Sequence, residues 1–259
     1  MSNYKLGKKP AVHDYKTLKL DYYLDAKAAQ IQIPQACDYT SKVNVKWGML
    51  KNDSVGDCAI AGPAHTEMIW NFNEGRSFIP TDQQVISDYS KVSGYDPRKD
   101  QPNGENPTDV GCNLLQVMKY WKKNGICGRK IDGYASVDPQ NKLQVQAAIY
   151  LFGSVIIGVA LPAGAKNSPW YLPNGWRQNR NWRPGTWGGH CIVSGKYNMA
   201  SNNIPVVTWG ALKDMSWGFL GQYCDEMYVP LSMDWVGDDK KAINGFDYAS
   251  LQADLKLFH

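Results

Sequence analysis

The most informative segment of this 259-residue chain spans residues 52–70 and reads NDSVGDCAIAGPAHTEMIW. Its apolar residues recur at helical spacing after a Gly-Asp turn, which predicts a helix from about residue 58 to residue 72. Proline fits best in the first turn of a helix, so we expect this helix to start late or to kink at Pro63. Cys58 stands at its start, where the helix dipole lowers the pKa of a thiol and favours the reactive thiolate. A buried core thiol is the alternative, because free cysteines are often buried.

His190 is the natural partner for this cysteine among the four histidines of the chain. It follows two glycines and opens an apolar run, and glycines allow a backbone or a substrate to approach closely. His65 lies on the same expected helix as Cys58, about 10 Å along its axis, so we expect a structural role for it. A lone histidine at the start of a strand can equally be structural.

Composition excludes several classes of protein. Hydrophobic residues make up 43% and charged residues 20%, which excludes a chain disordered throughout. The net charge is only +4, and the sequence contains no long block of like charges. We therefore expect no nucleic-acid partner. Residues 1–20 lack the apolar region of a secretion signal, and the apolar run 151–165 is short and broken by Gly and Pro. We therefore expect a protein that is cytoplasmic when made and does not insert into membranes.

The six cysteines are widely spaced and form no Cys-x-x-Cys pair. This spacing favours reduced core thiols over a zinc ribbon or a disulfide framework. The sequence also has no phosphate loop, no metal-ligand spacing and no dinucleotide fingerprint. We expect neither a metal nor a cofactor.

Helices are expected mainly in the first half of the chain and strands in the second. Residues 1–44 have little periodicity and predict an extended arm with one short strand. Capping patterns predict helices from Thr81 to Lys91 and from Val110 to Lys123, the second capped by Thr108-Asp109, and a further helix covers residues 139–152. Strands are expected at 154–160, 189–196, 205–209 and 223–230. An amphipathic helix is expected at 245–257.

This order predicts an α+β protein. Its single domain would span residues 45–259, with a helical lobe over about 45–138 and a β lobe over about 139–235. The arm would dock on this body or on a partner.

A segment rich in tryptophan and arginine precedes His190. It covers residues 170–187 and contains Trp170, Trp176, Trp182 and Trp187 together with three arginines. Flat aromatic rings interleaved with arginine can stack on sugars, bases or a protein partner. Substrate contact, an assembly interface and simple packing are all open readings of this segment.

An ordered series of short segments resembles the papain-like cysteine peptidases. It consists of the Cys58 segment, Gly-Cys-Asn at 111–113 with the helix after it, the segment 134–159, Gly-Gly-His-Cys-Ile-Val at 188–193, and Val-Thr-Trp-Gly at 207–210. The resemblance implies a two-lobed α+β fold in which Cys58 is the nucleophile and His190 its partner. Asn52 would assist in the oxyanion hole and Trp209 would shield the histidine. The same pieces also resemble uncharacterised phage and prophage proteins.

The sequence departs from the family pattern at several places. Asn52 stands where the family has a glutamine in the oxyanion hole, and its side chain is one methylene shorter. Val207 aligns with the family's third catalytic residue, an asparagine, and valine cannot orient an imidazole. Thr208 has a hydroxyl, but neighbours on a strand point to opposite faces, so a bulge would be needed to bring it to the histidine. Asp57 places a negative charge beside the nucleophile, which opposes thiolate formation. Val55 stands where the family's disulfide partner of Cys112 would be, which agrees with a reduced compartment.

Two functional hypotheses follow. In the first, the protein is a phage-associated hydrolase that cleaves an amide bond of a peptide or of peptidoglycan. Cys58 and His190 carry the reaction, Asn52 and Thr208 assist, and Trp209 with the tryptophan-rich segment contacts substrate. In the second, the fold is catalytically weak or inactive and serves as a structural, decoration or tail-associated component of a phage particle, where other particle proteins are its partners.

Overall fold

The computed structural model describes residues 4–27 and 32–236. Its helices are α1 (Leu20–Lys27), α2 (Cys58–Asn73), α3 (Asp82–Ser93), α4 (Leu114–Asn124), α5 (Lys142–Phe152) and α6 (Trp217–Tyr223). Its strands are β1 (Ala36–Asp38), β2 (Gly133–Ser136), β3 (Val155–Leu161), β4 (Gly188–Ser194), β5 (Lys196–Asn198), β6 (Val206–Thr208), β7 (Ala211–Lys213) and β8 (Cys224–Leu231). The helix expected at 245–257 lies outside the described residues.

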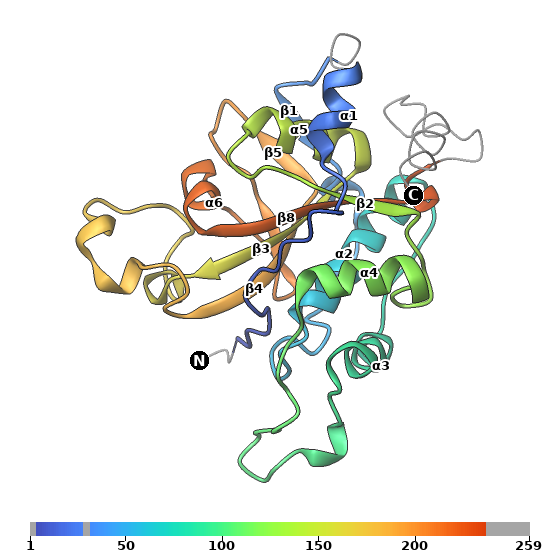
Figure 1. Ribbon diagram of the computed structural model, residues 1–259, viewed down its shortest axis with the longest axis vertical. Helices are drawn as coiled ribbons and strands as arrows, with labels where there is room; N and C mark the ends of the chain where they lie inside the picture. Colours follow the sequence, from blue (N-terminus) through green and yellow to red (C-terminus); the bar gives the residue numbers. More distant parts are fainter. Residues whose placement is uncertain (1–3, 28–31, 237–259) are drawn as a thin grey trace.

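Six of these strands form one antiparallel sheet in the order β2-β8-β3-β4-β6-β7 (Figure 1). The central strand β3 is almost fully buried, which explains why its sequence is a continuous apolar run rather than an alternating one. It pairs with β4 so that Val159 lies opposite His190. The sheet and the helices around it confirm the expected α+β class.

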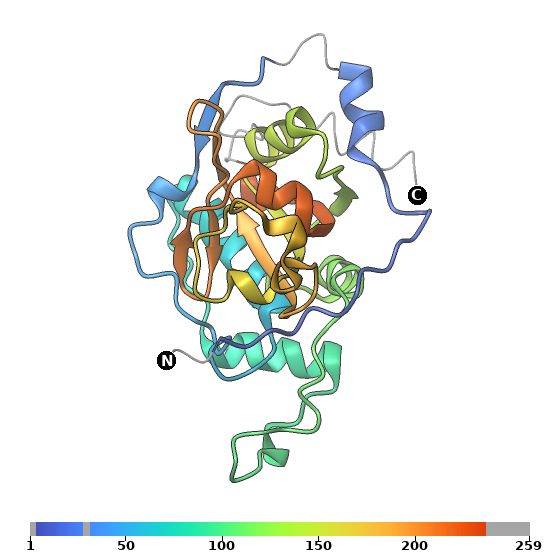
Figure 2. The ribbon, with the colours of Figure 1, turned by 90° about the vertical axis from the view of Figure 1, so that its left-hand side faces the viewer.

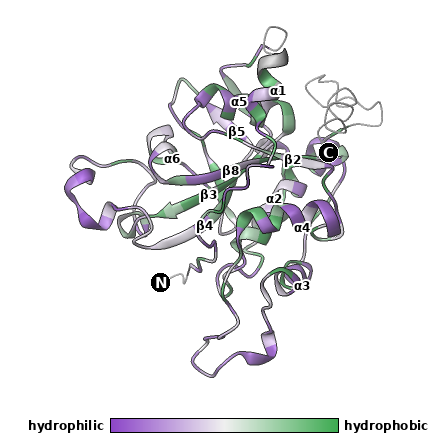
Figure 3. Cartoon of the chain, in the orientation of Figure 1, coloured by the Kyte–Doolittle hydropathy of each residue, from purple (hydrophilic) through white to green (hydrophobic). Residues whose placement is uncertain are grey.

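Helix α2 is the buried axis of the molecule. Nearly all of its residues are buried, and it packs against β3 and β4 on one side and α3 and α4 on the other. Figure 3 shows that hydrophobic residues predominate along α2 and β3, whereas α4 mixes hydrophobic and hydrophilic residues. Because α2 is enclosed on all sides, its first residue, Cys58, is buried as well.

This helix begins at Cys58, as its apolar spacing predicts, so the alternative of a late start is excluded and Pro63 lies in the helix interior. Proline lacks an amide hydrogen and removes one hydrogen bond from the helix interior. The packing of a fully buried helix offsets that loss.

The expected helix ends were partly correct. Thr81 and Gln84 form the predicted capping box of α3, and Gly94 ends that helix in the left-handed conformation. Helix α4 begins at Leu114 rather than Val110, because Asn113 and not Thr108 accepts the hydrogen bond that caps it. Helix α5 likewise begins after the cap Asn141, later than expected.

The N-terminal arm is more structured than expected. The predicted short strand is β1, which pairs with β5, but α1 was not predicted. Helix α6, capped by Ser216, was also not predicted. Figure 2 shows the segment before α1 (dark blue) running along the body, while the loop of residues 95–109 projects away from it. Within the described ranges, no helix is both long and apolar enough to cross a bilayer.

Candidate active site

Cys58 is the first residue of α2 and only 1% of its surface is exposed. Burial raises the pKa of its thiol to about 12, although hydrogen bonding with the backbone of Cys191 and Gly7 acts in the opposite direction. The expectation of a lowered pKa at the helix start is therefore wrong for this state of the chain. Desolvation of a thiolate in a dry interior outweighs the helix dipole.

His190 lies on β4 and is 1% exposed. Its Nε2 is 2.8 Å from the hydroxyl oxygen of Thr208, and its Nδ1 has no hydrogen-bond partner among the described residues. The Trp209 ring stacks on the imidazole with centroids 4.1 Å apart. Burial lowers the pKa of His190 to about 3, so the ring is neutral near pH 7.

Thr208 reaches His190 without a bulge on its own strand. Strands β4 and β6 pair with Val193 opposite Val207, which puts Thr208 on the His190 face of the sheet. Val207 shares the other face with Val193, which packs close to Gly62 of α2. The expectation that Thr208 points away is wrong, because that inference used position along one strand and not the register between two.

Asn52 and Asp57 flank the cysteine in the interior. The Asn52 side-chain amide donates one hydrogen bond to the Val55 carbonyl at 3.1 Å and also lies within hydrogen-bonding reach of the Asp57 carboxyl. Asp57 is fully buried, and burial raises the pKa of its carboxyl well above the usual range. Burial thus favours the neutral form of Asp57, whereas its ionised form acts to raise the pKa of the Cys58 thiol, in the direction expected from the sequence.

The N-terminal arm lies across this site, which the sequence reasoning missed. The Lys8 amide donates to the Gly189 carbonyl at 3.1 Å, next to His190. The Cys112 amide donates to the Gly7 carbonyl, and the Lys9 amide donates to the Cys112 carbonyl, both at 2.8 Å. Figure 1 shows this segment (dark blue) crossing β4 and β8 on its way to α1.

Glycines make this close passage possible. A Cβ on Gly7 would collide with the Gly56 carbonyl, one on Gly111 with the Gly7 carbonyl, and one on Gly189 with the Lys8 carbonyl. The site is thus a glycine-lined groove whose main-chain donors and acceptors pair with an extended segment. In the sequence, Gly7 was the one residue of the arm that could have indicated a close approach of two backbones.

The tryptophans divide into two groups. Trp170 and Trp182 are buried, Trp170 completely, and therefore contribute packing. Trp176, Trp187 and Trp209 are half-buried. Tyr4 of the arm stacks on Trp209 with centroids 4.3 Å apart, and the Trp209 indole donates to the Lys5 carbonyl. The partly exposed rings remain candidates for substrate contact.

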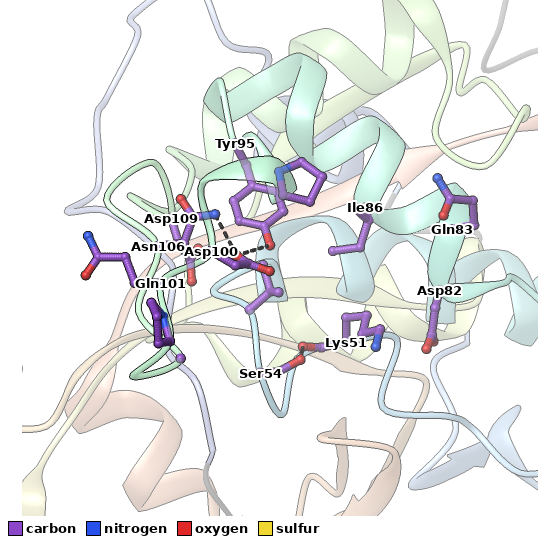
Figure 4. Close-up of a pocket in the computed structure, with 14 residues that line it drawn as sticks. Lys51, Ser54, Asp82, Gln83, Ile86, Tyr95, Asp100, Gln101, Asn106 and Asp109 are labelled. Carbon is purple, nitrogen blue, oxygen red and sulfur yellow. Dashed lines mark hydrogen bonds between the residues drawn. The ribbon is translucent and has the colours of Figure 1, made fainter.

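A hollow of about 570 Å³ adjoins the segment before Cys58 (Figure 4). It lies between residues 51–55, the start of α3 and the projecting loop 95–109. Asp82, Asp100 and Asp109 give it an acidic lining, to which Lys51 adds one basic side chain. A smaller hollow shares Gln101, Asn106 and Asp109 with it and is also lined by Lys5 of the arm.

The remaining titratable groups have structural roles or form no cluster. The His65 ring nitrogen Nε2 lies 3.1 Å from the Trp47 carbonyl, which confirms the structural role expected for it. All six cysteines are free thiols, as expected. Across the described ranges, no group of three or more His, Cys, Asp and Glu side chains is placed to hold a metal ion.

Comparison with solved structures identifies the fold. Xylellain, a cysteine protease from Xylella fastidiosa, matches with a TM-score of 0.65 and 15% identity over 89% of this chain and 97% of that one. The Carica candamarcensis cysteine protease CMS1MS2, solved with E-64, matches with a TM-score of 0.51 and 14% identity over 77% and 99% of the two chains. Procathepsin L 3 from the larval midgut of Tenebrio molitor matches with a TM-score of 0.55 and 10% identity over 89% and 76%.

No protein-family model and no curated protein sequence matches the chain. The structural similarity, at these low identities, establishes the architecture. The chain has the α+β fold of the papain-like cysteine proteases.

Proposed function

We propose that the protein is a cysteine hydrolase that cleaves amide bonds of polypeptides, with Cys58 as nucleophile and His190 as proton carrier. The observation that carries this proposal is the arrangement of the imidazole. Thr208 holds Nε2 at 2.8 Å, while Nδ1 is buried and has no partner among the described residues. A ring fixed at one nitrogen and free at the other is what a general base requires. The Cys58 thiol reaches the backbone of Cys191, the residue next to this ring.

The reaction would proceed by acyl transfer. His190 takes the thiol proton, and the sulfur attacks the carbonyl carbon of the substrate to form a tetrahedral oxyanion. As the first residue of α2, Cys58 has a backbone N–H without an acceptor inside the helix, and this N–H together with the Asn52 side-chain amide would stabilise the oxyanion. His190 then protonates the departing amine as the C–N bond breaks. Water hydrolyses the thioester and restores the thiol and the free acid.

A polypeptide substrate agrees with the shape of the groove. Gly189 and Cys112 pair with the arm through backbone groups alone, as an added strand would. This pairing favours a polypeptide over a peptidoglycan crosslink, which offers less regular main chain.

In the resting chain the arm excludes substrate. With Cys58 at a pKa of about 12 and His190 at about 3, the pair is uncharged near pH 7. Departure of the arm would admit water, lower the thiol pKa and raise the imidazole pKa. We propose that activity requires this departure.

The test uses a full-length Gly7→Ala chain, whose new Cβ collides with Gly56 and displaces the arm. We expect this variant, after incubation with E-64, to carry the inhibitor on Cys58 by peptide mass, and to cleave members of a mixed peptide library. The Gly7→Ala/Cys58→Ala chain should do neither. A folded Gly7→Ala chain that neither reacts nor cleaves would rule out the hydrolase.

A second candidate function rests on the same filled groove. A fold whose cleft is closed by its own arm, and whose 171–186 loop is largely exposed, also suits a structural or tail-associated component of a phage particle. Location in a virion remains a prediction from the sequence resemblance. Sedimentation of the purified protein separates the two functions, because a particle component self-associates whereas a hydrolase of this size remains monomeric.

A further inference from the structure

Lys8 carries its charge into the interior of the protein. Its side chain is 1% exposed. Its ammonium lies 2.8 Å from Asp225 Oδ2, 3.1 Å from Glu226 Oε1 and 3.0 Å from the Lys9 carbonyl. A buried ammonium is costly unless its hydrogens are paired, and here each of the three has an oxygen within reach.

The two acids reach the same ammonium because β8 is irregular at this point. Gly158 of β3 lies opposite Glu226, but Val159 lies opposite Cys224, so Asp225 is an extra residue on β8. In a regular strand, neighbouring side chains point to opposite faces. The irregularity turns Asp225 so that both carboxylates meet at one place, which is a common use of β-bulges beside binding sites.

Gly158 provides the room. A Cβ at this position would collide with the Lys8 side chain and with Cγ of Glu226. The pocket therefore consists of a glycine that leaves the space and two acids that supply the charge, with a side wall at Cys191, which lies opposite Gly158 on β4. We call Gly158, Asp225 and Glu226 the acidic pocket.

The acidic pocket outweighs the cost of burial. Burial acts to lower the pKa of Lys8, but Glu226 and Asp225 together raise it above its usual value, so the lysine stays cationic. The other contacts of Gly7, Lys8 and Lys9 with Gly189 and Cys112 are backbone hydrogen bonds, which do not discriminate among sequences. Residue 8 is therefore a position at which the groove can select a charged side chain.

From this geometry we infer that the acidic pocket is a specificity site, which accepts a lysine or arginine side chain from an extended polypeptide in the groove. Lys8 occupies that site in the resting chain. The substrates would then be polypeptides with a basic residue at this position. This inference rests on the proposed function, but its test does not require hydrolysis.

The direct test is binding to the full-length chain with Cys58→Ala, Gly7→Ala and Lys8→Ala, which cannot cleave and whose arm is displaced. The probe is a fluorescent heptapeptide with the sequence of residues 4–10, YKLGKKP. Two copies carry arginine or methionine at its fifth position, which corresponds to Lys8. We expect the lysine and arginine peptides to bind at least tenfold more tightly than the methionine peptide. Adding Asp225→Asn and Glu226→Gln should reduce that preference to below threefold.

Equal binding of the methionine peptide, absence of binding by all peptides, or a preference that survives loss of both acids would overturn the inference. Failure of the hydrolase proposal is a separate result, because it is read from cleavage by chains that retain Cys58.

A second measurement avoids the multiple variant in case it does not fold. Lys8→Arg and Lys8→Met in the otherwise unchanged chain differ in charge and have side chains of comparable length. Alkylation of Cys58 reports whether the arm is docked. We expect Lys8→Arg to protect Cys58 as the unchanged chain does and Lys8→Met to be alkylated at least tenfold faster. Equal protection in the two variants would contradict a charge-selective pocket.

Discussion

Thr208 gives His190 its orienting hydrogen bond, at the place where the family pattern has an asparagine. By the sequence alone, the residue that orients the histidine is missing, because Val207 occupies the position aligned with that asparagine. The pairing of Val193 with Val207 places the hydroxyl correctly, and such a register is a property of two strands. Cys58, His190 and Asn52 could be recognised from local spacing, but Thr208 could be assigned only after the strands were paired.

Replacing Thr208 tests its positioning role. Thr208→Val keeps the shape of the side chain but leaves Nε2 of the buried His190 without its partner. We expect a loss of about 1–3 kcal/mol in the free energy of unfolding, measured with urea. In the arm-displaced chain we also expect a lower kcat for peptide cleavage.

Thr208→Ser is the matched control, because it retains the hydroxyl. It should preserve most of the kcat and shift the pH profile little. If Thr208→Val and Thr208→Ser behave alike, the hydrogen bond at 2.8 Å has no positioning role.

The position of helix α2 could be predicted from the sequence, but its complete burial could not. Its apolar pattern and its Gly-Asp entry were sufficient to place the helix and to put Cys58 at its start. The pattern could not show that the helix is enclosed on all sides, and enclosure sets the pKa values of its polar residues. Glu67 of α2 is fully buried, and burial raises the pKa of its carboxyl well above the usual value.

This buried acid makes stability depend on pH in a defined direction. A carboxyl with a higher pKa in the folded than in the unfolded chain keeps its proton on folding. Its contribution to stability is therefore lost as pH rises from its ordinary pKa of 4.5 through the raised value. Glu67→Gln removes this titration, so the variant should gain about 1.4 kcal/mol over the unchanged chain for each pH unit in that window.

Urea unfolding of both chains at pH 5.0 and 6.5 measures this gain. Glu105→Gln, on the exposed loop, separates the effect of burial from that of the substitution itself. A stability difference between Glu67→Gln and the unchanged chain that is the same at both pH values would show that Glu67 is ionised in the folded protein.

At the scale of the whole molecule, the arm is the feature that sequence reasoning missed. Lys8 and Asp225 are separated by 217 positions, and no local pattern predicts a contact over that distance. The α+β class, by contrast, follows from the order of helical and strand-like segments. The closed groove is a consequence of where the arm lies, and we propose that the uncharged state of Cys58 and His190 follows from it as well.

We propose two linked properties of one site: Cys58 and His190 form a pair that can react, and the docked arm keeps that pair uncharged. Gly7→Ala separates them, because its Cβ displaces the arm without changing either reacting residue. Gly218→Ala is a matched control, since a Cβ there would make only ordinary contacts.

The most direct measurement is the rate of Cys58 alkylation by iodoacetamide between pH 5 and pH 9, read by peptide mass. In the unchanged chain and in Gly218→Ala we expect slow labelling that rises about tenfold per pH unit, as for a thiol with a pKa of about 12. In Gly7→Ala we expect labelling at pH 6 to be at least tenfold faster, and this gain should be lost in Gly7→Ala/His190→Ala. Labelling of Gly7→Ala that follows an ordinary thiol profile and is indifferent to His190 would contradict the account.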